Sequence, residues 1–263
     1  MPEETVRLEI KNRVAWLTFN QPEKLNAMDD TMAGDFRRAV EHLRTDPLPR
    51  VVVLTGAGRS FSAGGDLERM KSRVGSDPIQ RKKESFAFYY SFLRIRELEI
   101  PTIAAINGHA IGAGACVALA CDMRIAAENS RIGFTFAKIG LYPGMGAEYF
   151  LIRLVGRAKT YELLMTGDIL DAQEAWRIGL VNRVVPADRL MDEAGQLAEK
   201  IAAMPVLPIR LLKEAIDAAL HNTLAETLQR EATYQALCYH TTDIVEGIEA
   251  VREKRTPRFK DEY

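Results

Sequence analysis

A glycine-spaced segment, Gly112-Ala113-Gly114, follows the apolar run Ile103–Ile106 and opens a second apolar run that extends to about Cys121. Small residues where a strand turns into a helix allow a ligand to approach the backbone closely. The first N–H groups of the helix have no partner within it, and its dipole favours negative charge. Such a corner can hold an oxygen that becomes anionic during a reaction. Two further glycine-rich corners are expected at Gly56–Asp66 and Leu141–Gly146.

Other common chemistries find no support in the sequence. The dinucleotide fingerprint needs Gly or Ala three residues after Gly114, and Val117 stands there. There is no P-loop and no GxSxG nucleophile elbow. No metal site is expected, because the four histidines lack metal-ligand spacing; they are His42, His109, His221 and His240.

Composition predicts a cytoplasmic protein. The chain has 263 residues, 47% hydrophobic and 27% charged, with a net charge of −1 that argues against a nucleic-acid interface. The three cysteines form no CxxC pair and are expected to be free thiols, at Cys116, Cys121 and Cys238. No stretch has the length of a membrane span, and the acidic N-terminus lacks a signal-peptide core.

Hydrophobic patterning predicts strands alternating with helices in the first half and mostly helices in the second. The order favours stacked ββα units over a doubly wound sheet. Residues 1–204 are expected to form this core, and residues 205–263 a helical region that packs on the core or on a neighbouring subunit. The expected strands are Val6–Ile10, Val14–Phe19, Val51–Thr55, Ile103–Ile106, Arg124–Ala126, Arg131–Phe134 and Val181–Val185.

Five ordered blocks resemble the successive signatures of the crotonase (enoyl-CoA hydratase/isomerase) superfamily, and together they cover nearly the whole chain. They read NQPEKLNAM, VVVLTGAGRSFSAGGDLERM, IPTIAAINGHAIGAGACVALACDMRIA, FAKIGLYPGMGA and LLMTGDILDAQEAWRIGLVNRVV. The resemblance implies an α/β spiral of ββα units with helical C-terminal packing, assembled as a homotrimer or hexamer. It also implies an acyl-CoA thioester as substrate, with coenzyme A entering as part of the substrate and no permanently bound cofactor.

The resemblance further implies an oxyanion hole made of the backbone N–H groups of Gly65 and Ala113. Main-chain donors cannot be deprotonated and need not reorganise during the reaction, and stabilising the enolate acidifies the α-carbon. By motif position, the coenzyme A portion would lie along Lys24, Leu25 and Ala27, with Ala63, Asp66 and Leu67 lining the pantetheine and thioester. Phe259 and Lys260 would reach the coenzyme A of a neighbouring subunit.

The carboxylates that the resemblance leads one to expect are missing. Hydration requires an acid and a base around one water. The two glutamate stations of hydratases hold Cys116 and Phe136, and the aspartate station of an isomerase branch holds Gly144. Glu148, one helical turn past Gly144, either projects into the pocket or charges the first turn of its helix. Cys116 is either a nucleophile or a small buried hydrophobe, and Tyr142 either donates a hydrogen bond or packs.

Two hypotheses follow. In the first, the chain is an acyl-CoA enzyme that stabilises a thioester enolate and catalyses isomerisation, decarboxylation or hydrolysis of an unusual acyl group, with Glu148, Tyr142 and Cys116 as candidate catalytic side chains. In the second, it is a catalytically weak acyl-CoA-binding or assembly protein. A structural homologue with a closed pocket is a third reading.

Overall fold

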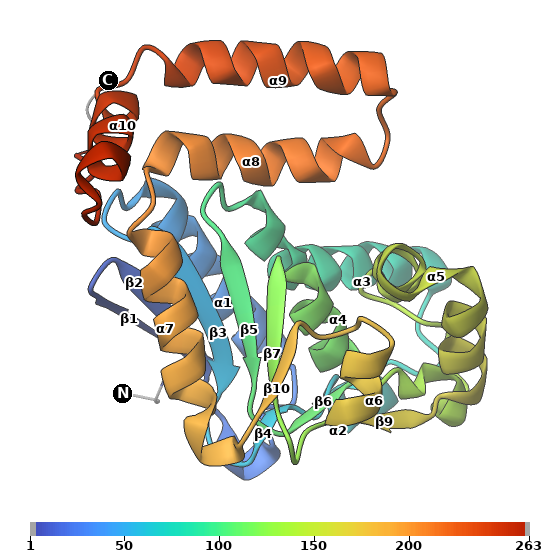
Figure 1. The fold of residues 1–263 in the computed structure, drawn as a ribbon. Coiled ribbons are helices and arrows are strands. Elements are labelled where there is room, and N and C mark those ends of the chain that lie inside the picture. The colour runs from blue at the N-terminus through green and yellow to red at the C-terminus, as the bar shows by residue number, and fades with distance from the viewer. Residues whose placement is uncertain (1–3, 261–263) are drawn as a thin grey trace.

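The two strands of each ββα unit enter different sheets, which gives the fold its spiral form. The computed structural model describes residues 4–260. Within each repeat, the first strand joins a large sheet, the second joins a small one, and a helix follows (Figure 1). The large sheet has the order β1 (Val6–Lys11), β2 (Val14–Phe19), β3 (Val51–Gly56), β5 (Thr102–Ile106), β7 (Met123–Ala127) and β10 (Arg183–Val185). The small sheet has the order β4 (Ser60–Ser62), β6 (His109–Ile111), β8 (Arg131–Gly133) and β9 (Ile169–Asp171).

Both sheets are mainly parallel. Within residues 4–260, β1–β2 in the large sheet and β8–β9 in the small sheet are the antiparallel pairs, and the other pairs are parallel. The stacked ββα units expected from the sequence are therefore confirmed. The three-residue strands β4, β6 and β9 had not been expected, because strands that short carry almost no periodicity of their own.

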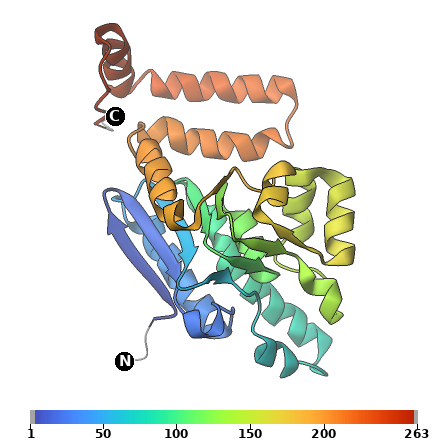
Figure 2. The same ribbon diagram turned by 60° about the horizontal axis from the view of Figure 1, so that its bottom comes forward.

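The helices cover both faces of the large sheet and continue into a C-terminal extension (Figures 1 and 2). Those of the core are α1 (Asp30–Thr45), α2 (Leu67–Lys71), α3 (Pro78–Leu93), α4 (Ala113–Ala120), α5 (Ala147–Thr166), α6 (Ala172–Arg177) and α7 (Leu190–Ala202). The extension holds α8 (Val206–Ala219), α9 (Leu224–Cys238) and α10 (Asp243–Glu253). Short 3-10 turns lie at η1 (Pro22–Lys24), η2 (Arg94–Glu97), η3 (Thr135–Ile139) and η4 (Ala187–Arg189).

The hydrophobic core has two parts because alternate residues of a strand face opposite sides of a sheet. Val51 and Val53 of β3 pack against α7, whereas Val52 and Leu54 face the main core. Helix α4 lies within that main core, and each of its residues is buried. This explains why its sequence is apolar on all sides.

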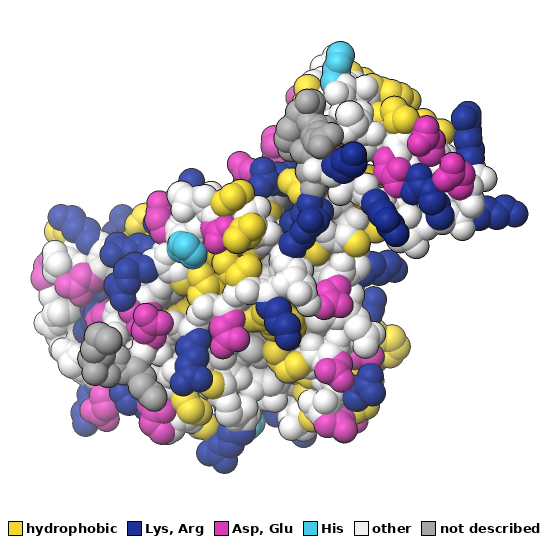
Figure 3. All heavy atoms as spheres, turned by 90° about the vertical axis from the view of Figure 1, so that its left-hand side faces the viewer, with side chains coloured by type: hydrophobic (Ala, Val, Ile, Leu, Met, Phe, Trp, Pro, Cys, Tyr) yellow, Lys and Arg dark blue, Asp and Glu magenta, His cyan; other side chains and the backbone are white. Residues whose placement is uncertain are grey.

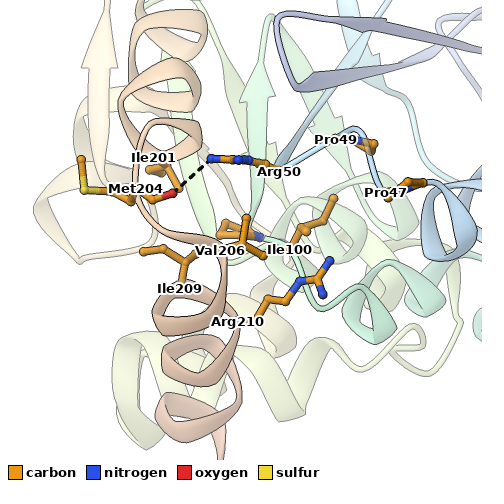
Figure 4. Close-up of a pocket in the computed structure, with 10 residues that line it drawn as sticks. Pro47, Pro49, Arg50, Ile100, Ile201, Met204, Val206, Ile209 and Arg210 are labelled. Atoms are coloured by element: carbon orange, nitrogen blue, oxygen red, sulfur yellow. Dashed lines mark hydrogen bonds between the residues drawn. The ribbon is translucent and has the colours of Figure 1, made fainter. Parts of the chain in front are cut away.

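The helices α8 to α10 form an arm that projects from the core (Figures 1 and 3). No residue of α8 or α9 is buried, and apolar side chains are exposed along the arm, including Leu212, Ile216, Leu220 and Leu228. At its base, the Arg50 guanidinium donates a hydrogen bond to the Ala202 carbonyl oxygen at the end of α7 (3.0 Å). It also donates to the Met204 carbonyl oxygen (3.5 Å), the bond that Figure 4 shows. The pocket there encloses only about 30 Å³, room for a water molecule and not for a substrate.

Candidate active site

The glycine corners of two ββα units meet at a cavity of about 420 Å³. Residues 63–65, after β4, and residues 111–113, after β6, form one wall. A single stripe of α3 forms another, since Arg81, Ser85, Phe88 and Tyr89 stand at helical spacing on one face. Phe136 and Leu141 close the side toward the third corner.

The N–H of Gly65 has no protein acceptor within residues 4–260, because of how Gly65 pairs with Met28. Gly65 forms a parallel bridge with Met28, in which Met28 N–H donates to Gly64 O (2.7 Å) and Asp66 N–H donates to Met28 O (3.0 Å). A parallel bridge uses the peptide groups on either side of Gly65 and not its own N–H. Within residues 4–260 this N–H donates no hydrogen bond.

The N–H of Ala113 is unpaired for a different reason: Ala113 is the first residue of α4. Gly112 makes the turn that points this N–H toward the cavity. Its φ of 52° lies in the region that glycine adopts more readily than other residues. Helix α4 then approaches β4 so closely that a Cβ on Gly114 would lie 2.6 Å from the Cβ of Ser62. Glycine at residue 114 therefore permits the contact between the two units.

The two corners are in direct contact. A Cβ on Gly64, which has a φ of 94°, would lie 2.6 Å from Ile111 O and 3.6 Å from the Ala113 nitrogen. Gly64 directly precedes Gly65 in the chain. The backbone next to the Gly65 N–H therefore lies beside Ala113. The structure brings Gly65 and Ala113 together on one cavity wall, and their role as oxyanion donors stays a prediction.

The loop that carries Lys24, Leu25 and Ala27 lies beside the first corner. Ala63 N–H donates to Leu25 O (2.9 Å), and Ser62 Oγ donates to Asn26 O (2.7 Å). The side chain of Asn26 is fully buried and bonds Gln21 N–H, Ala57 O and Ser60 O. The sequence alone gave no reason to expect a role for Asn26. The φ of Asn26 is 55°, so this residue also makes a turn in the loop.

The other residues expected to contact coenzyme A separate into two groups. Ala63 and Leu67 line the cavity, whereas the Asp66 carboxylate caps α2 by accepting from Arg69 N–H (2.7 Å). Phe259 lies against the arm, and Lys260 N–H donates to Asp243 (2.9 Å). Neither Phe259 nor Lys260 lines the cavity of its own chain.

Cys116 lies behind the cavity wall. Its side chain is fully buried, and its Sγ is 3.6 Å from Gly144 O, to which the thiol donates. Burial raises the pKa of the Cys116 thiol far above its ordinary value, so a thiolate is strongly disfavoured. This environment favours the packing role for Cys116 over that of a nucleophile.

Glu148 and Tyr142 lie in a neighbouring hollow of about 640 Å³ that shares only Leu141 with the first cavity. Both are exposed, and Tyr142 Oη donates to Glu148 Oε2 (2.8 Å). This hydrogen bond and the carboxylate charge raise the pKa of Tyr142. The structure therefore does not bring the pair to the wall formed by Gly65 and Ala113, and a catalytic role for either side chain stays a prediction.

The charge on the cavity wall is positive. Three arginines line it, Arg69, Arg73 and Arg81, and no carboxylate does among residues 4–260. Arg69 and Arg73 both pair with Asp30 outside the cavity (2.7 Å each). The hydrogen bond from Arg69, with the nearby charge of Arg73, lowers the pKa of Asp30.

In residues 4–260, no three His, Cys, Asp or Glu side chains gather in a way that suits a metal ion. None of the helices in that range combines the length and the apolar composition needed to cross a membrane.

The fold is a spiral of ββα units, and its glycine corners present unpaired main-chain N–H groups to a cavity. Proteins of this class can hold a carbonyl oxygen through their backbone. Residues 9–262 match the family model described as enoyl-CoA hydratase/isomerase, and the chain belongs to this family. It is 36% identical over 257 residues to a 1,2-epoxyphenylacetyl-CoA isomerase of Escherichia coli, an alignment that covers 97% of this chain and 98% of the relative. It is 35% identical over 261 residues to a crotonyl-CoA hydratase of Syntrophomonas wolfei, with 98% of this chain and 99% of the relative covered. The crystal structure of an enoyl-CoA hydratase from Bacillus anthracis superposes with a TM-score of 0.91 at 36% identity and covers 98% of this chain and 100% of that one.

Proposed function

We propose that this protein binds an acyl-CoA thioester and stabilises its enolate between the N–H groups of Gly65 and Ala113. The observation that carries the proposal is that two main-chain donors without protein acceptors face one cavity from adjoining corners. In a site of limited water access, such donors stabilise developing negative charge without reorganising. The coenzyme A portion would extend along Lys24, Leu25 and Ala27, whose loop is hydrogen-bonded to the corner that carries Gly65.

The reaction is an isomerisation, decarboxylation or hydrolysis in preference to hydration. Adding water across a double bond needs an acid and a base placed around that water. Among residues 4–260 the cavity wall offers no carboxylate, and by motif position Cys116 and Phe136 stand where hydratases hold theirs. Sequence identity does not decide the reaction, because an isomerase and a hydratase match almost equally well.

Acetoacetyl-CoA tests the proposed oxyanion hole without requiring turnover. Its enolate absorbs in the near ultraviolet, and a site that stabilises the enolate lowers the pKa of the α-carbon. We expect the absorbance of the enolate to rise when the protein is titrated into acetoacetyl-CoA at neutral pH, and to fall again when butyryl-CoA competes. Binding without any increase in absorbance would contradict the assignment of Gly65 and Ala113.

The alternative function is that of an acyl-CoA-binding or assembly protein with little catalysis. It is favoured because Glu148 and Tyr142 lie exposed in a separate hollow and Cys116 is buried, so none of these three candidate side chains lines the cavity. The two functions differ in one outcome, since a pure binding protein would hold a panel of acyl-CoA thioesters without converting any of them.

We also propose that the arm mediates self-association into a homotrimer or hexamer. Its exposed apolar side chains would otherwise remain in water, and burying each would contribute about 1.5–3 kcal/mol. Light scattering is expected to give the mass of three or six chains. The double substitution Leu212→Glu and Ile216→Glu is expected to shift the mass toward one chain, whereas Lys11→Glu, on the exposed edge of β1, should leave it unchanged. A wild-type protein with the mass of one chain would overturn this proposal.

A further inference from the structure

Tyr89 is a polar side chain of the cavity that the proposed oxyanion hole does not use. It stands on the α3 stripe that faces the cavity, directly after Phe88. Phe88 is buried and packs against Phe92, which in turn contacts Phe19 and Phe36. This aromatic cluster fixes the rotation of α3 and thereby turns Tyr89 toward the cavity.

The Tyr89 hydroxyl occupies the space that a side chain at residue 144 would need. A Cβ built on Gly144 would lie 2.6 Å from Tyr89 Oη and 2.8 Å from Tyr89 Cζ. No real Cβ makes contacts that short, so a larger residue at 144 and the present position of Tyr89 exclude each other. The third corner thus has no side chain at residue 144, and the Tyr89 hydroxyl from α3 fills that space.

The hydroxyl is free to act on a ligand. Within residues 4–260 it makes no hydrogen bond, and the same cavity is lined by Gly65 and Ala113. Gly144, beside which the hydroxyl lies, accepts from the thiol of Cys116, and Cys116 belongs to α4, the helix that Ala113 begins. The hydroxyl and the Ala113 N–H therefore line one cavity, on walls that are linked through Gly144 and Cys116.

We propose that Tyr89 is the acid–base residue of this site and transfers the proton at the α-carbon of the acyl group. The proposal rests on the oxyanion hole described above. The Tyr89 oxygen takes the α-proton, the electron pair of the C–H bond moves into the bond between the α-carbon and the carbonyl carbon, and the electrons of the carbonyl π bond move to the oxygen held by Gly65 and Ala113. Tyr89 then returns a proton to the acyl chain, so the residue ends the cycle in the state in which it began. Because one group both takes and returns the proton, this arrangement suits an isomerisation, which moves a proton within the substrate.

Exchange of the α-protons of butyryl-CoA with deuterium from D2O, followed by mass spectrometry, tests this role directly. We expect the wild-type protein to exchange them and Tyr89→Phe to exchange them about 100-fold more slowly. The substitution keeps the ring and removes one oxygen, so folding is preserved. Tyr90→Phe is the matched control, because Tyr90 is adjacent on α3 but does not line the cavity, and it should exchange at the wild-type rate.

Gly144→Ala displaces the hydroxyl by a second route, since its methyl group would meet Tyr89 Oη. Exchange is expected to fall in this variant and to fall no further when Tyr89→Phe is added. The enolate absorbance of bound acetoacetyl-CoA separates the two proposals, because it reports the oxyanion hole alone and should survive in Tyr89→Phe. Wild-type-like exchange in Tyr89→Phe, or enolate absorbance with no exchange in the wild type, would overturn the role of Tyr89 and leave the oxyanion hole standing. A wild-type protein that gives neither signal overturns both.

Discussion

Replacing Ala113 by proline is expected to slow enolate formation by roughly 100- to 1000-fold, the usual cost of removing one donor from an oxyanion hole. Proline lacks the backbone N–H, so the change deletes one of the two proposed donors. Exchange of the α-protons of butyryl-CoA should fall by this factor. The enolate absorbance of bound acetoacetyl-CoA should be lost in parallel, because the remaining donor at Gly65 stabilises the anion less.

The fold is expected to tolerate this proline because of where residue 113 stands. It is the first residue of α4, a position at which proline is favoured and where no intrahelical hydrogen bond is lost. The residue before a proline must avoid helical backbone angles, and Gly112 already does so, with φ 52° and ψ −116°. Folding can therefore be verified by thermal unfolding, which should change little.

Ala113→Gly is the matched control, because it alters the side chain and keeps the N–H. We expect this variant to retain exchange and enolate absorbance within a few-fold of the wild type. If Ala113→Pro folds, binds acyl-CoA and still generates the enolate at the wild-type rate, residue 113 is not an oxyanion donor.

Hydration of crotonyl-CoA is expected to be on the order of 10⁴-fold slower than in a hydratase with both glutamates. A single positioned acid or base contributes typically about 10²–10⁴-fold, and by motif position this chain lacks both glutamates. Phe136 occupies one position with an apolar ring at the cavity wall. Cys116 occupies the other as a buried thiol whose raised pKa keeps it protonated.

The crotonyl-CoA hydratase of Syntrophomonas wolfei is a suitable reference, since it aligns with 98% of this chain. Both proteins would be assayed side by side by the loss of absorbance of the conjugated thioester. Comparable values of kcat/KM would show that another group supplies the acid and base, and that the reading of residues 116 and 136 is wrong.

The sequence determined the family and the spiral of ββα units, because these depend on features that are local in the chain. Apolar runs such as Val51–Thr55 and Ile103–Ile106 predict buried strands, and glycine at 112 and 114 predicts a close turn into a helix. Backbone donors also follow from local structure, since the first N–H of a helix is unpaired wherever that helix lies. This reason applies to Ala113, whereas the N–H of Gly65 is unpaired because of the bridge to Met28, and the pairing of these two residues was expected from the family resemblance.

Tertiary structure alone decided which side chains share the cavity. Glu148 and Tyr142 are close to Gly144 in the chain, yet the start of α5 turns them into a separate hollow. Tyr89 is 55 residues from Gly144 in the numbering and meets it through the packing of α3. A helix places its side chains by its rotation about its own axis, and that rotation is set by distant contacts such as Phe88 and Phe92 with the aromatic core. Nothing local in the sequence encodes such contacts, so the hydroxyl that takes the place of the missing carboxylates became visible only in three dimensions.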